Sequence, residues 1–316
     1  MKSPAPDSNP ALNLAQRPIS FAVLMLVSII LVLIWGGAYT MVGVGVRHMS
    51  PIWLVAYRLV IGVVLVSGYA LARGQRFPPL RDPRWRWYLM LGITGSVLPF
   101  YLLSSGQVHV DSGVTAIIVG AMPILTIILA HFFADEQLTP LKLTGFFIGF
   151  LGIVVLFLPE NFSLSLIGDW KAQLLIVGAA VCYAFTTVFA KRAPPTPSSI
   201  AGAMMLICAA VIGMAFAVFT SPLSLPMDPM GHYMAWGLGI GSTGIATVLY
   251  LWVIEKTGPT MLAKINYFTP VISVIFGVWL LHEPFTWRLI FSFAVIVLGI
   301  LIARIPPKPD LKPGGD

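Results

Sequence analysis

Charged side chains that lie inside long apolar stretches are the first candidates for function. Lys264 and Arg58 each stand several residues into such a stretch. Because a charge in hydrocarbon is costly, both are candidates for binding a substrate carboxylate or phosphate. The alternative for Lys264 is a long stem that reaches the cytoplasmic interface. For Arg58 we favour a structural role that holds helix ends or loop carbonyls.

Aromatic and hydroxyl side chains form a second group of candidates, because an apolar body with a polar edge suits a pocket for an amphipathic solute. Some recur at helical spacing, as Trp35 and Tyr39 do. Asn266 also fits a close contact between helices, which favours small and polar residues. The predicted substrate-binding residues are Trp35, Tyr39, Tyr101, Tyr183, Thr187, Thr243, Tyr250, Lys264, Asn266 and Tyr267.

Pro123 and Pro270 stand inside apolar stretches, where each frees a backbone carbonyl and bends its helix. We predict that both are hinges, with a fixed kink in each helix as the alternative. Glu136 and Glu283 fall at the ends of apolar stretches. Capping or loop-closing contacts explain these two acids better than transport chemistry does.

The sequence contains no motif for enzyme catalysis or metal binding. It has no His-Glu-x-x-His motif and no metal-ligand spacing, so we expect no catalytic residue, no metal and no cofactor. A membrane-embedded enzyme or lipid-handling protein is therefore disfavoured. No Asp or Glu lies deep in an apolar stretch, which argues against transport of organic cations. Cys182 and Cys208 fit small core residues.

The elements that position these residues are membrane spans. Only 10% of the residues are charged, against about 25% in a soluble domain. A span needs about 20 apolar residues. We predict an all-α polytopic membrane protein with ten transmembrane helices at 20–44, 51–72, 86–105, 112–134, 140–158, 171–190, 198–220, 231–253, 258–281 and 285–305.

The distribution of Lys and Arg predicts the orientation. With the N-terminus inside, fourteen of them fall on the inner side and three on the outer side, while Arg58 and Lys264 lie within spans. The positive-inside rule favours this assignment, so both termini are expected in the cytoplasm. The net charge of +7 is therefore read as membrane topology, and no nucleic-acid partner is expected.

The second half of the sequence repeats the first. At an offset of 147 residues Pro123 aligns with Pro270 and Gly152 with Gly299. At an offset of 149, Gly92–Gly95 aligns with Gly241–Gly244. Five spans is an odd number, so the two copies must be inserted in opposite directions. An inverted repeat is typical of transporters that open a central site to alternate sides.

Family motifs agree with this pattern. The chain resembles the ten-helix EamA branch of the drug/metabolite transporter superfamily, and the resemblance covers almost its whole length. Its motifs include Leu33-Ile34-Trp35-Gly36-Gly37, Tyr57-Arg58-Leu59, Ala121-Met122-Pro123 and Tyr267-Phe268-Thr269-Pro270. The resemblance implies a pseudo-symmetric bundle around a cavity lined mainly by the first, third, fourth, sixth, eighth and ninth spans.

These observations give one expected organisation. Residues 1–19 form a disordered cytoplasmic tail, 20–158 and 171–305 two repeats of five helices, and 306–316 a second tail. We predict a multi-pass inner-membrane transporter that exports amino acids or related neutral or zwitterionic metabolites by alternating access. The alternative is a carrier for an anionic carboxylate or phosphate that uses Lys264. The expected partners are the solute and the lipid bilayer; a monomer is expected, with a homodimer as the alternative.

Overall fold

The computed structural model describes residues 20–110, 115, 118–120, 122–134, 137–157, 169–221, 228–269, 272 and 287–303. Within these ranges the chain is helical and contains no strand. The first half contributes α2 (Phe21–His48), α3 (Pro51–Ala72), α4 (Arg84–Gly92), η1 (Ile93–Val97), α5 (Leu98–Gly106), α7 (Met122–Phe133) and α8 (Pro140–Phe157). The second half contributes α9 (Trp170–Lys191), α10 (Ser198–Thr220), α11 (Pro229–Gly237), η3 (Leu238–Ile245), α12 (Ala246–Thr257), α13 (Pro259–Asn266) and α15 (Trp287–Ala303).

Six continuous helical stretches within these ranges are long and apolar enough to cross a membrane. They are Phe21–His48, Pro51–Ala72, Arg84–Gly106, Trp170–Lys191, Ser198–Thr220 and Pro229–Thr257. The shorter helices α7, α8, α13 and α15 fall within four further predicted spans. Pro270, Glu136, Glu283 and both tails lie outside the described residues, so the full set of ten spans stays a prediction.

Local sequence sets where several helices begin. Asp169 accepts a hydrogen bond from the backbone N–H of Ala172, and Asp228 accepts one from that of Met230, so each aspartate caps a helix start. Pro51, Pro229 and Pro259 stand at the first positions of their helices, where a missing N–H costs nothing. Gly258 separates α12 from α13 with a φ of 83°, a conformation that glycine adopts without strain.

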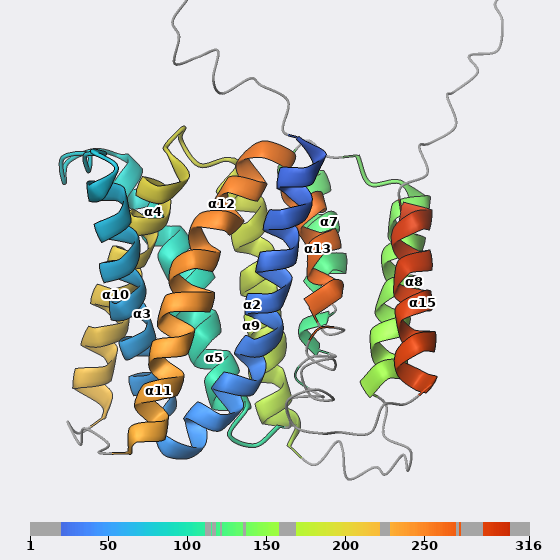
Figure 1. Cartoon of the computed structure of the whole chain (residues 1–316), viewed down its shortest axis with the longest axis horizontal. Helices are drawn as coiled ribbons and strands as arrows, with labels where there is room; N and C mark the ends of the chain where they lie inside the picture. Colours follow the sequence, from blue (N-terminus) through green and yellow to red (C-terminus); the bar gives the residue numbers. More distant parts are fainter. Residues whose placement is uncertain are drawn as a thin grey trace, which may run out of the picture.

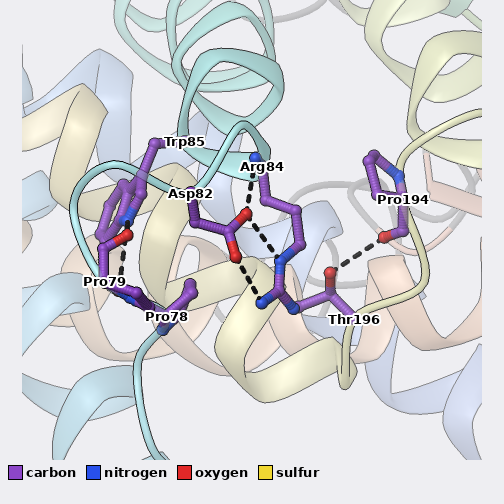
Figure 2. A network of polar contacts seen from close by, with 7 residues as sticks. All are labelled: Pro78, Pro79, Asp82, Arg84, Trp85, Pro194 and Thr196. Atoms are coloured by element: carbon purple, nitrogen blue, oxygen red, sulfur yellow. Dashed lines mark hydrogen bonds and ion pairs between the residues drawn. The ribbon is translucent and has the colours of Figure 1, made fainter.

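The loop between α3 and α4 is held by its own side chains (Figure 2). The Asp82 carboxylate accepts hydrogen bonds from the Arg84 backbone N–H, Nε and Nη2 at 2.9, 3.0 and 2.8 Å. These bonds lower the pKa of Asp82. The Trp85 indole donates to the Pro78 and Pro79 carbonyls at 3.3 and 3.2 Å. The loop thus supplies a fixed start for α4.

Small residues allow α8 and α15 to pack closely. A Cβ at Gly145 would lie 2.4 Å from the Gly299 carbonyl oxygen and 2.8 Å from the Ala303 side chain. Such spacing of small residues is a common device for helix association in membranes. Figure 1 shows this pair at one side of the bundle, next to α7 and α13. Phe146 of α8 joins the pair to Ile127 and Ala263 in one buried cluster.

The remaining helices pack across the two halves of the sequence. Helix α3 packs against α10 and against η3, while α4 and η1 pack against α10 and α5 packs against α9. Helix α11 in turn packs against α2. Apolar side chains such as Phe219 (87% exposed) and Val211 point away from the bundle, as expected for surfaces that face lipid. The cores therefore lie between the halves of the chain.

Candidate functional site

Two π-helical segments occupy the middle of long helices. Segment η1 interrupts the helical stretch Arg84–Gly106, and η3 interrupts Pro229–Thr257. The two segments coincide with the sequence matches at the offset of 149, so Thr94 corresponds to Thr243. Short π-helices inside α-helices are frequent at functional sites because they redirect side chains. Here they present hydroxyl groups to the interior of the bundle.

A cavity of about 150 Å³ lies beside these segments. Its walls come from α2, α3, α5, α7, α9, α10, α12, α13, η1 and η3, with further residues just before α7 and just after α13. The aromatic lining residues are Trp35, Tyr39, Phe100, Tyr183 and Tyr250. The polar ones are Arg58, Ser96, Thr186, Thr187, Ser242, Thr247, Asn266 and Thr269.

Six of the ten predicted binding residues line this cavity. They are Trp35, Tyr39, Tyr183, Thr187, Tyr250 and Asn266. The Trp35 and Tyr250 rings meet edge to face at 6.3 Å, and the Tyr250 hydroxyl donates to Thr187 Oγ1 at 3.3 Å. Asn266 Nδ2 lies 3.7 Å from Met122 Sδ. The structure thus gathers residues from α2, α9, α12 and α13 around one space.

The other four predicted residues lie elsewhere. The Tyr101 ring packs against Phe216, and the Tyr267 hydroxyl donates to the Phe146 carbonyl. Thr243 is fully buried behind the wall, and Lys264 is half-buried on α13 outside the lining. Their predicted roles receive no support from this geometry. Pro123 is buried in α7, and its role as a hinge stays a prediction.

Arg58 occupies a different place from the one that the sequence suggested. We expected it to hold helix ends or loop carbonyls. Instead it borders the cavity, 4% exposed, and donates through Nε to Thr243 Oγ1 at 2.9 Å and through Nη2 to Ser242 Oγ at 2.8 Å. Its guanidinium carbon lies 3.8 Å from the centre of the Phe100 ring, within the range of a cation–π contact.

Several lining residues carried no clear signal in the sequence. Phe100, Ser96 and Ser242 are of types common in any apolar helix. The sequence feature that could have located them is the match between the Gly-rich segments 92–95 and 241–244, which overlap the two π-helical segments. A glycine at 95 is needed there, since a Cβ would lie 2.6 Å from Thr186 Cγ2.

An all-helical bundle with apolar outer faces and a cavity lined by aromatic and hydroxyl side chains is typical of polytopic membrane transporters. Comparison with known proteins identifies the family. The model of the EamA-like transporter family matches residues 21–158 and 170–305, and the chain belongs to this family. The predicted family resemblance is thereby confirmed.

Individual relatives agree with this assignment. The chain is 26% identical over 295 residues to the uncharacterized inner membrane transporter YedA of Escherichia coli K12, covering 90% of this chain and 92% of YedA. It is 26% identical over 285 residues to the uncharacterized transporter YoaV of Bacillus subtilis, with 88% and 95% covered. One solved crystal structure shares the fold with a TM-score of 0.71 at 22% identity, covering 88% of this chain and 96% of that one.

These findings give the general function and location. The protein is a multi-pass inner-membrane protein of a transporter family, as the sequence predicted.

Proposed function

We propose that the protein carries a small neutral or zwitterionic metabolite, an amino acid or a close relative, out of the cell by alternating access. The observation that carries this proposal is the cavity. It is lined from both halves of the chain by aromatic rings and hydroxyl groups. Such walls suit a solute with an apolar body and polar ends.

The packing of the helices supports the two-repeat mechanism. At the offset of 147 residues α3 corresponds to α10 and α8 to α15, and each of these helices packs against its counterpart. Helices α7 and α13, which fall within the matching predicted spans 112–134 and 258–281, also pack against each other. In a transporter built from inverted repeats, one half moves against the other around a fixed site. The two π-helical segments, η1 and η3, add a further matched pair.

A panel of solutes in proteoliposomes tests this function. The purified protein is reconstituted, and counterflow of each of the twenty amino acids is measured against protein-free vesicles. We expect exchange of a subset with small or aromatic side chains. Flat traces for the whole panel would contradict the proposed substrate class.

The second candidate is a carrier for an anionic metabolite. Its specific support is Arg58, which brings a positive charge to the cavity wall. The version of this hypothesis that used Lys264 as the anion site is weakened, because Lys264 is not among the residues that line the cavity.

A further inference from the structure

The cavity wall holds a buried positive charge whose hydrogen-bond partners are neutral. Ser242 and Thr243 accept from Arg58 through hydroxyl oxygens, and Phe100 covers the guanidinium with its ring. None of these groups carries a negative charge. Taking an ion out of water costs several kcal/mol unless an opposite charge or excellent hydrogen bonding compensates for it. A bound anion would therefore compensate for the buried charge of Arg58.

The carboxylates of the described residues are engaged elsewhere. Asp82 binds Arg84, Asp228 binds His48, and Glu255 binds Lys256 and Ser198. Asp169 caps α9. All four lie at or near helix ends, and no ion pair among the described residues includes Arg58.

We propose that Arg58 binds the carboxylate of the transported solute, so that the substrates are monocarboxylates: zwitterionic amino acids under the first candidate function, or carboxylates without an amino group under the second. This inference rests on the proposed transport function and names the group that its site recognises. A guanidinium donates parallel hydrogen bonds to a carboxylate from a planar fork. The bonds to Ser242 and Thr243 on η3 fix the orientation of that plane at the edge of the cavity.

The size and charge of the site further restrict which solutes can bind. A dry cavity of roughly 150 Å³ in a protein core holds a molecule as large as benzene. The body of the solute then lies against the aromatic wall formed by Trp35, Tyr183 and Tyr250. Arg58 is the single cationic side chain among the described lining residues. One guanidinium matches a monoanion better than a phosphate ester, which carries a charge of about −1.5 to −2.

Matched pairs of ligands test this on the unaltered protein. The melting temperature of the protein in detergent is measured with benzoate against benzamide, leucine against leucinamide, and phenylalanine against phenylalaninamide. The two members of each pair differ mainly in whether they carry a carboxylate or an amide. We expect at least one acid to raise the melting temperature, and its amide to bind about tenfold more weakly or worse. Equal shifts within every pair, or no shift from any acid, would overturn the proposal.

Phenyl phosphate is a further arm of the same measurement. It presents the same ring as benzoate with a larger negative charge. We expect weaker binding than that of benzoate. Tighter binding of phenyl phosphate would replace the carboxylate with a phosphate as the recognised group.

Variants then assign the effect to Arg58. Arg58→Gln removes the charge and is expected to abolish the difference between acid and amide, whereas Arg58→Lys keeps the charge but loses the fork and is expected to weaken acid binding. Arg47→Gln, an exposed arginine at the end of α2, is the matched control. A preserved acid preference in Arg58→Gln would contradict the assignment. If Arg58→Gln does not fold, the ligand pairs on the unaltered protein still show whether the protein recognises a carboxylate.

Measurements of solute flux test the role of Arg58 and the transport function separately. Equal transport of acids and amides in proteoliposomes would leave the transporter function intact and refute the role of Arg58. Selective binding of acids that depends on Arg58, without flux of any solute, would support the carboxylate site and refute transport.

Discussion

The Thr186 hydroxyl donates a hydrogen bond to the Thr94 hydroxyl at 2.7 Å and joins α9 of the second half to η1 of the first. A second bond joins the two halves in the other direction, from Arg58 of α3 to Thr243 of η3. Thr94 and Thr243 occupy matching positions at the offset of 149. Each π-helical segment is thus bonded through its threonine to a helix of the opposite half, beside the cavity.

The Thr186→Val substitution tests the first of these bonds. Valine keeps the shape of threonine but cannot donate, so we expect a loss of about 1 kcal/mol of stability. The Thr94 hydroxyl keeps its own bond to the Met90 carbonyl, which limits the cost. The melting temperature in detergent measures the effect. Thr220→Val, at an exposed end of α10, is the control and should change it little.

Filling the cavity should stop transport. Ala38 lines it on α2, and Ala38→Phe would place a ring in the space between Trp35 and Val42. Flux in proteoliposomes is expected to fall to the level of empty vesicles, while the protein remains folded by its elution profile. Ala22→Phe, at an exposed position of the same helix, should transport normally. Undiminished flux in Ala38→Phe would remove the cavity from the transport path.

Much of the helical framework follows from the sequence. The spans predicted at 51–72 and 198–220 coincide with α3 and α10, because each apolar run has a clear start and stop. Prolines at or before the first helical turn account for much of this agreement. Other long helices extend beyond their predicted ends by a few residues, since polar end residues continue the helical hydrogen bonds.

The site was harder to predict than the helices. A helix in lipid is apolar on every side, so periodicity does not say which face points inward. Tyr267, directly after α13, illustrates this, because its hydroxyl donates to the Phe146 carbonyl of α8 and the residue does not line the cavity. The π-helical geometry that places Ser242 and Thr243 together against Arg58 also leaves only a Gly-rich pattern in the sequence.

The contact between α8 and α15 should be sensitive to added volume. A Cβ at Gly299 would lie 2.4 Å from the Gly145 carbonyl oxygen and 2.5 Å from the Gly149 backbone nitrogen, and backbone atoms cannot move aside easily. We expect Gly299→Val to destabilise the protein by about 3 kcal/mol, the upper part of the usual range for overpacking. The readout is the melting temperature in detergent.

Gly68 on α3 provides the control for that substitution. A Cβ at this position meets no heavy atom within 4 Å. Gly68→Ala is expected to leave the protein unchanged or to stabilise it by up to about 1 kcal/mol, because alanine favours the helix. Equal effects at positions 68 and 299 would mean that α8 and α15 do not pack as described.

The pair of Asp228 and His48 predicts a dependence of stability on pH. His48 Nδ1 lies 2.6 Å from Asp228 Oδ2, and this bond, with those from the backbone N–H groups of Met230 and Gly231, lowers the pKa of Asp228 below its usual 3.8. A carboxyl whose pKa is lowered by folding stabilises the protein above its unfolded pKa. That contribution disappears as the pH falls through the folded pKa.

Asp228→Asn isolates the charge, because asparagine still caps α11. The difference in melting temperature between the native protein and this variant should be present at pH 6 and shrink as the pH is lowered below 3.8. Asp228→Ala removes the cap as well and should remain less stable than Asp228→Asn at every pH. A difference between the native protein and Asp228→Asn that stays constant from pH 6 to pH 3 would show that the carboxylate charge does not link α2 to α11.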